Sequence, residues 1–170
     1  MRQRRSFVVA MVGITAALAF SLGSLGPTVA PGGGRVSLAD VPVLLLALIG
    51  GTGAGVAAGA VYGFLHFVSE PISTNPLGFL LDYPIADACL GLAGLFAGRS
   101  LTKARIVLGI LLGVGLNFLV HVISGVLLWG AHGWMASCLY NASYRGPVLV
   151  LDLAIVPWLA LRTRRLWRAR

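Results

Sequence analysis

Five ionisable side chains lie within long apolar stretches of this sequence. They are His66, Asp82, Asp87, His121 and Asp152. If these stretches cross a bilayer, each such side chain is expensive to bury in hydrocarbon and is a candidate functional residue by default. Carboxylates and imidazoles in that setting attract cations or form hydrogen bonds with a polar ligand. The sequence therefore predicts a polar pocket inside a membrane protein.

The apolar segment at residues 104–130 carries the most informative pattern. Asn117, His121, Gly125 and Trp129 recur every four residues and so share one face of a helix. A glycine between a histidine and a tryptophan leaves a flat recess, where a planar ligand can stack on Trp129 and hydrogen-bond to His121. The same pattern suits helix packing, with glycine for close approach and tryptophan at the membrane interface. The spacing alone does not separate the two interpretations.

A second group begins with Asp82-Tyr83-Pro84, near the start of the segment at residues 77–98. Because Asp82 follows a polar connection, it can face an outward-open cavity and attract a cation or accept a hydrogen bond from a ring amine. The alternative is a carboxylate at a helix start, favoured by the macrodipole. A carboxylate at a helix start is also the role expected for Asp40. Asp87 lies about one turn deeper than Asp82 and is a candidate partner for a histidine.

Two further sets of polar residues fall near segment ends. Asn141 and Ser143 are typical N-cap residues, and the same groups can recognise donors and acceptors on a heterocycle. Tyr62 and His66 are four residues apart and share a helix face, for which the sequence favours packing.

The composition predicts the environment of these residues. The 170-residue chain is 58% hydrophobic and 11% charged, with a mean hydropathy of +0.90. A soluble domain has about 25% charged residues, so we expect an all-α integral membrane protein. The formal net charge of +8 is then explained by membrane orientation rather than by nucleic acid. The length leaves no room for a soluble catalytic domain.

Glycine and proline clusters and charges divide the chain into six apolar segments of one membrane domain. The expected helices are residues 6–25, 37–49, 52–68, 77–98, 104–130 and 143–162. A straight spanning helix needs about 20 residues, so the second is expected to be tilted or partial and to line a cavity. The first is interpreted as a retained helix, because residues 27–34 offer no convincing signal-peptide cleavage site.

The basic residues predict the orientation of these six transmembrane helices. Eleven of the thirteen Lys and Arg residues fall on one side, whereas Arg35 and Arg145 fall on the other. Cytoplasmic connections of membrane proteins carry an excess of Lys and Arg, so both termini are expected in the cytoplasm.

Motifs for enzymes and nucleotides are absent from the sequence. It contains no GxxxxGK(S/T), HExxH or GxSxG, and Cys89 and Cys138 lack the spacing of metal ligands. His121 and Ser124 lie three apart, which leaves a small intramembrane hydrolase as an alternative, although a Ser/His dyad usually joins different elements. We therefore predict no catalytic residue, metal or cofactor.

Three stretches together resemble the thiamine-specific substrate-binding subunit, or S component, of energy-coupling factor (ECF) transporters. They are residues 36–67, residues 78–96 (GFLLDYPIADACLGLAGLF) and residues 117–144, which contain His-x-x-Ser-Gly-x-x-x-Trp and Tyr-Asn-x-Ser-Tyr. The resemblance implies a six-helix vitamin-binding subunit, without enzymatic activity, in the cell membrane of a prokaryote. Release of the vitamin inside would depend on a transmembrane coupling subunit with two ATPase subunits.

The resemblance also implies roles for individual residues. The substrate-binding set is Asp82, Tyr83, His121, Gly125, Trp129, Asn141 and Tyr144, and the set that docks the coupling subunit is Gly13, Thr15, Ala17 and Ala19. Asp82 stands where the family has Glu, and Ala136 lies near the place of a pocket Tyr. The connection at residues 26–36 lacks the Trp that helps to close the site in the family. The alternatives are another vitamin such as riboflavin, a pyrimidine precursor of thiamine, or a structural protein without a ligand.

Overall fold

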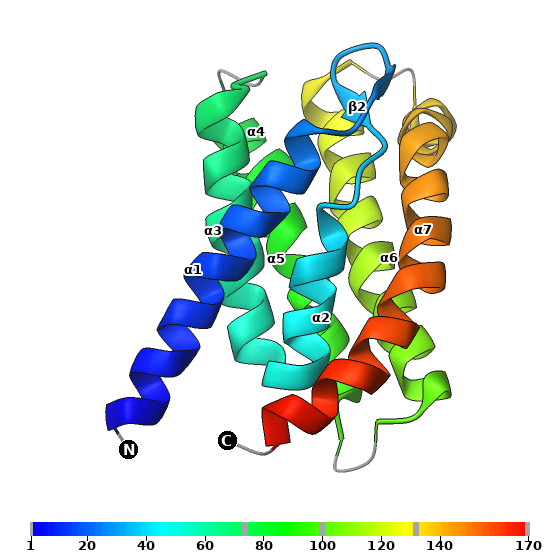
Figure 1. The fold of residues 1–170 in the computed structure, drawn as a ribbon. Helices are drawn as coiled ribbons and strands as arrows, with labels where there is room; N and C mark the ends of the chain where they lie inside the picture. Colours follow the sequence, from blue (N-terminus) through cyan, green and yellow to red (C-terminus); the bar gives the residue numbers. More distant parts are fainter. Residues whose placement is uncertain (1, 73–74, 99–100, 131–132, 169–170) are drawn as a thin grey trace.

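The computed structural model describes residues 2–72, 75–98, 101–130 and 133–168, and most of these residues are helical. Arg99 and Arg170, two of the basic residues assigned to the inner side, lie outside the described residues. In chain order the elements are α1 (Arg2–Ser24), β1 (Thr28–Ala30), β2 (Gly34–Arg35), α2 (Asp40–Gly50), α3 (Thr52–Ser69), α4 (Pro76–Leu80), η1 (Leu81–Ile85), α5 (Ala86–Leu90), η2 (Gly91–Phe96), α6 (Lys103–Leu128) and α7 (Trp134–Arg168) (Figure 1).

Within the described residues, five helical stretches are long and apolar enough to cross a membrane, as expected for an all-α membrane protein. Four of them lie in α1, α3, α6 and α7, and the fifth is the composite stretch Pro76–Phe96. The sixth helical segment, α2, has only 11 residues, so the expectation of a short second segment is confirmed. The start of α1 and the end of α7 lie at the same end of the bundle, away from the β1–β2 hairpin (Figure 1).

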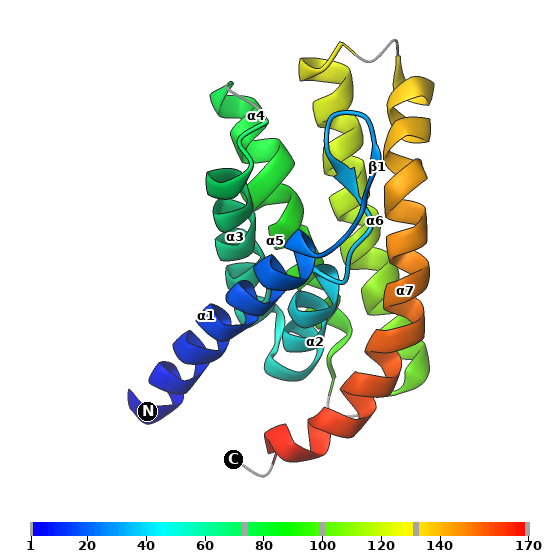
Figure 2. The ribbon, with the colours of Figure 1, turned by 45° about the horizontal axis from the view of Figure 1, so that its top comes forward.

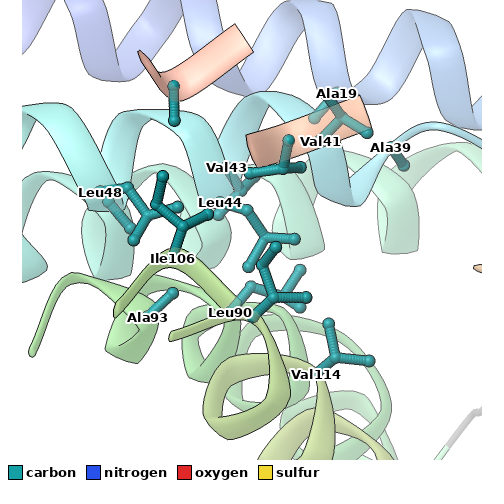
Figure 3. Close-up of a cluster of buried hydrophobic side chains, with 14 of the residues drawn as sticks. Ala19, Ala39, Val41, Val43, Leu44, Leu48, Leu90, Ala93, Ile106 and Val114 are labelled. Atoms are coloured by element: carbon teal, nitrogen blue, oxygen red, sulfur yellow. The ribbon is translucent and has the colours of Figure 1, made fainter. Parts of the chain in front are cut away.

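The short helix α2 occupies the centre of the bundle, where it contacts α1, α3, η2 and α7. Its side chains are almost all apolar, and Val43 and Leu44 are completely buried. They belong to one cluster with Leu90 of α5 and Ile106 of α6 (Figure 3). Close van der Waals packing of this kind holds helices together in a membrane, where lipid is as apolar as the side chains. The cluster therefore holds together the helices that also carry the polar residues of the site.

Glycines bring α3 into direct backbone contact with the fourth span. A Cβ atom at Gly59 would overlap the carbonyl group of Asp87, and one at Gly63 would lie 2.5 Å from the Tyr83 carbonyl oxygen. Only glycine permits so close an approach. The contact fixes the stretch that carries Asp82 and Asp87 against α3.

The fourth span is not one continuous α-helix. A π-helical turn, η1, separates α4 from α5, and the span ends in the 3₁₀-helix η2. Pro84 lies inside η1 and has no N–H to donate, which favours a break in the regular α-helical hydrogen bonds. In an α-helix, Asp82 and Asp87 would point about 140° apart at about 100° per residue. With the wider π turn between them, both border the same cavity.

The connection after α1 forms a small antiparallel hairpin, in which Thr28 pairs with Arg35 and Ala30 pairs with Gly34. Gly32 and Gly33 have positive φ values of 81° and 105°, which glycine adopts readily, so they make the tight turn. Both strands contact α7, and the hairpin lies beside the helices at one end of the bundle (Figure 2).

The last helix is longer than the sequence predicts. It begins at Trp134 rather than at residue 143. The hydroxyl group of Ser143 donates to the Tyr140 carbonyl oxygen within the helix at 2.6 Å, so it does not cap a helix start. Arg145, assigned to the outer side at the start of the sixth segment, lies inside α7.

Candidate ligand-binding site

A cavity of about 500 Å³ lies between the helices next to the β1–β2 hairpin. Its wall includes every residue that the sequence analysis assigned to the substrate: Asp82, Tyr83, His121, Gly125, Trp129, Asn141 and Tyr144. These residues come from η1, α6, the residue after α6, and α7. The fold thus brings together positions up to 62 residues apart in the chain, from Asp82 to Tyr144.

A carboxylate, an imidazole and an indole form a cluster on one side of the cavity. The indole Nε1–H of Trp129 donates to Asp82 Oδ2 at 2.8 Å, and His121 Nδ1 lies 3.6 Å from Asp82 Oδ1. Trp129 is 49% exposed, so its ring has free surface. The hydrogen bond orients this ring, and the carboxylate retains lone pairs for a cationic or amine-bearing ligand.

Gly125 brings α6 close to α7. A Cβ atom at this position would overlap the hydroxyl oxygen of Ser137, whose hydroxyl group donates to the Val122 carbonyl oxygen at 2.9 Å. Helix packing therefore explains the glycine. Gly125 also borders the cavity, so the packing interpretation and the ligand interpretation of this position are compatible.

The α7 side of the wall is held by hydrogen bonds within the helix. Asn141 is 3% exposed; its Nδ2 donates to the Ser137 carbonyl oxygen at 2.9 Å and its Oδ1 accepts from the Tyr144 hydroxyl at 2.6 Å. Asn141 lies inside α7, so the N-cap interpretation was wrong. Its side chain orients the phenol ring of Tyr144, which remains half-buried at the cavity wall.

A buried ion pair on the wall was not foreseen from the sequence. Arg145 Nη2 lies 2.6 Å from Asp40 Oδ2, and the two side chains are 10% and 5% exposed. This pair joins α7 to the first turn of α2. An arginine at the start of an apolar segment needs an acidic partner if it is buried, but the sequence does not identify which acid that is. Asp40 is also at a helix start, as predicted.

Asp87 is paired differently from the expectation. Its Oδ1 accepts from Asn117 Nδ2 at 3.3 Å, and the same amide donates to the Ala86 carbonyl oxygen at 2.9 Å. Asp87 borders the cavity, whereas the completely buried Asn117 does not. The partner is therefore an asparagine of α6 and not a histidine, and Asn117 joins the two helices.

The aromatic rings next to α3 define the other side of the cavity. Tyr62 and His66 stack with their ring centroids 5.9 Å apart, so the predicted packing is present, and both residues also border the cavity. Tyr83 is 3% exposed. Its hydroxyl group donates to the Glu70 carbonyl oxygen at 2.8 Å and accepts from the Ile72 N–H at 3.0 Å. Tyr83 thereby fixes the chain after α3 beside the cavity.

The hairpin contributes residues 31–35 to the wall. Arg35 Nη2 donates to both carboxylate oxygens of Glu70, at 2.9 and 3.1 Å. The hydroxyl group of Tyr140 donates to the Pro31 carbonyl oxygen. These contacts hold the hairpin at the cavity from two sides, and residues 26–36 contain no Trp. Ala136 also borders the cavity.

The four residues assigned to docking face two directions on α1. Thr15 is 6% exposed and Ala19 is completely buried, because this face packs inside the bundle. Gly13 and Ala17 are exposed. Thr15 and Ala19 therefore face the protein's own helices, and Gly13 and Ala17 are accessible.

Ser124 is completely buried and does not border the cavity, which gives no support to a His121–Ser124 dyad. Cys89 and Cys138 are free thiols. Over the described part of the chain, no group of three or more His, Cys, Asp or Glu residues is arranged to hold a metal ion.

The helices and the cavity define a multi-pass membrane protein with an internal site for a small ligand. The chain belongs to the thiamine transporter family. The family described as Thiamine transporter protein (Thia_YuaJ) matches residues 9–167. The assignment confirms the resemblance found in the sequence and places the protein in a prokaryotic cell membrane.

Individual relatives agree with this assignment. The chain is 28% identical over 156 residues to the thiamine transporter ThiT of Bacillus subtilis (strain 168), with 82% of this chain and 81% of that protein covered. It is 30% identical over 177 residues to ThiT of Lacticaseibacillus paracasei, with 92% and 88% covered. Both relatives are named as transporters, which confirms the expectation that the chain is not an enzyme.

A solved structure of ThiT from Listeria monocytogenes has the same fold. The TM-score is 0.78 at 20% identity, and the match covers 96% of this chain and 98% of the other.

Proposed function

We propose that this protein binds thiamine in the cavity and acts as the substrate-binding subunit of an ECF-type importer. The observation that carries the proposal is the cluster of Asp82, His121 and Trp129 on the cavity wall of a thiamine transporter family member. Thiamine is a cation in which a planar thiazolium ring is joined through a methylene group to an aminopyrimidine ring. A carboxylate suits its charge and its amine, and contact of the cationic ring with Trp129 would contribute about 0.5–2 kcal/mol.

The proposed orientation places both termini in the cytoplasm and the hairpin outside. It is supported by the basic residues, most of which gather near the chain ends and in the connection before α6. It is also supported by the start of α1 and the end of α7, which lie at the same end of the bundle (Figure 1). In this orientation thiamine enters from the outside, near the hairpin.

In this proposal another protein supplies the energy for release, and the sequence contains no nucleotide-binding motif of its own. We assign this role to a transmembrane coupling subunit with two ATPase subunits. The exposed face of α1 that carries Gly13 and Ala17 is the proposed contact, since small residues allow a second helix to approach closely.

Titration calorimetry with Asp82→Asn tests the ligand and the site. The asparagine keeps the shape and an oxygen that accepts from Trp129, but it removes the charge. Thiamine should bind at least tenfold more weakly, a loss of about 1.4 kcal/mol. A neutral analogue without the thiazolium ring should lose much less, because it gains no Coulomb energy from Asp82. Asp152→Asn is the matched control, since Asp152 is completely buried and lies off the cavity.

The outcomes separate three situations. Equal losses for both ligands would mean that Asp82 hydrogen-bonds the pyrimidine and does not compensate the positive ring. Unchanged titrations with Asp82→Asn would show that the assigned site is wrong. A wild-type protein that binds no thiamine would refute the proposed substrate, and another vitamin should then be sought by native mass spectrometry of the purified protein.

A further inference from the structure

His66 offers the cavity a second imidazole, on a different helix from the residues of the Asp82 cluster. It belongs to α3, whereas His121 belongs to α6, and α5 lies between these two helices in both views (Figures 1 and 2). Both histidines border the same cavity. A ligand between α3 and α6 would therefore meet an imidazole on each side.

The orientation of the His66 ring is fixed by two tyrosines. It stacks on Tyr62 with an angle of 9° between the ring planes, and it meets Tyr83 edge-on at 5.2 Å and 72°. These tyrosines are 7% and 3% exposed, so neither has room to turn away. Tyr83 is fixed further by its two hydrogen bonds to the chain after α3. A ring held in this way keeps its nitrogen atoms in fixed positions, which is the preorganisation that a binding site requires.

The two histidines differ in what surrounds their nitrogen atoms. His121 lies beside the Asp82 carboxylate. Within the described residues, the ring of His66 has stacking partners but no hydrogen bond or ion pair, and its nitrogens are not among the enclosed polar atoms. Since the side chain is only partly buried and borders the cavity, these nitrogens are available to a ligand.

The surroundings of His66 suit an uncharged polar group. Its ring neighbours are phenols, and Glu70, the acid that follows α3, is paired with Arg35. A neutral imidazole carries one donor and one acceptor, so it can form a hydrogen bond with a hydroxyl group in either direction. A second cationic centre would gain little there, in contrast to the Asp82 side.

We propose that His66 is a further ligand-binding residue, which hydrogen-bonds a hydroxyl group of the ligand at the end remote from Asp82. The assignment rests on the proposed function, because it takes thiamine as the ligand. The hydroxyl group of thiamine lies at the end of a flexible chain on the thiazolium ring. With thiamine held by the Asp82 cluster, this chain extends across the cavity to α3. His66 then distinguishes ligands by the presence of the hydroxyl group.

His66→Phe tests the assignment in the full-length protein, because it keeps an aromatic ring between the two tyrosines and removes both nitrogens. Titrations should use thiamine and deoxythiamine, in which the hydroxyl is replaced by hydrogen. His66→Phe should bind thiamine at least tenfold more weakly and deoxythiamine within twofold of the wild type. Phe64→Leu is the control, since Phe64 lies on the same helix, is 53% exposed and does not border the cavity. It should leave both affinities within twofold.

A loss of the same size for both ligands would overturn the assignment, since His66 would then only shape the wall. Unchanged affinities for both would overturn it as well. If His66→Phe does not fold, the wild type alone decides: it must prefer thiamine over deoxythiamine at least tenfold, and equal affinities refute the hydroxyl contact. Wild-type protein that binds neither compound refutes the proposed function together with this assignment.

Discussion

Arg145→Met should destabilise the protein strongly, because it leaves the Asp40 carboxylate without its cation. The Asp40 side chain is 5% exposed, and its Oδ2 lies 2.6 Å from Arg145 Nη2. Removing one partner of a buried ion pair costs about 3–5 kcal/mol, mainly because the remaining charge stays desolvated. At about 2–4 °C per kcal/mol for a chain of this length, Tm should fall by roughly 6–20 °C.

Arg35→Met is the matched control for this prediction. It removes the same functional group from the ion pair between Arg35 and Glu70, whose N–O distance is 2.9 Å but whose side chains are 24% and 39% exposed. Pairs in contact with water contribute about 0–1 kcal/mol. Its Tm should therefore fall by less than about 4 °C. The measurement is thermal unfolding of the purified proteins in one detergent, followed by tryptophan fluorescence.

The double variant Asp40→Asn/Arg145→Met identifies the cause of the loss. It removes the uncompensated charge while keeping the size of the Asp40 side chain, so it should recover most of the Tm lost in Arg145→Met. The reasoning is refuted if the double variant is no more stable than Arg145→Met. It is also refuted if Arg145→Met and Arg35→Met lose the same amount.

Three further predictions concern the topology, the docking face and the contact between α6 and α7. In a cysteine-free background, Asn75→Cys should react with an impermeant thiol reagent on intact cells and Lys103→Cys should not; the reverse pattern contradicts the orientation. Ala17→Leu should block uptake with the coupling subunit and leave thiamine titrations unchanged, so normal uptake would exclude this face of α1. Gly125→Ala places a methyl group against the Ser137 hydroxyl and should cost about 1–3 kcal/mol of stability. Adding Ser137→Ala should restore much of that stability, and no recovery would show that this clash is not the cause.

The part of the site on α6 could be predicted because it depends on one helix. His121, Gly125 and Trp129 are spaced by four, and an α-helix places such residues on one face whatever surrounds it. Asp82 could be added because an acid in an apolar span needs a polar environment. The structure confirms that all four border one cavity.

The residues that the sequence missed depend on contacts between distant segments. Asp40 and Arg145 are 105 residues apart, and no local pattern states that they meet. Asn141 resembles a helix cap by residue type, but α7 continues through it. On α1, Gly13 and Ala17 are four residues apart, and so are Thr15 and Ala19. The packing of α1 on its neighbours decides that Thr15 is buried and Ala17 exposed.

Because the fourth span contains the π turn Leu81–Ile85, the relative orientation of its two acids depends on the number of residues between them. A π turn is equivalent to an α-helix that contains one additional residue. Deleting one residue between Asp82 and Asp87 would allow a regular α-helix, in which the two acids are four residues apart. Four residues at about 100° each place two side chains about 40° apart on an α-helix, so both acids would still face the same side. A one-residue alignment gap between the two acids is therefore compatible with both at one cavity, whereas a regular helix of unchanged length would separate them.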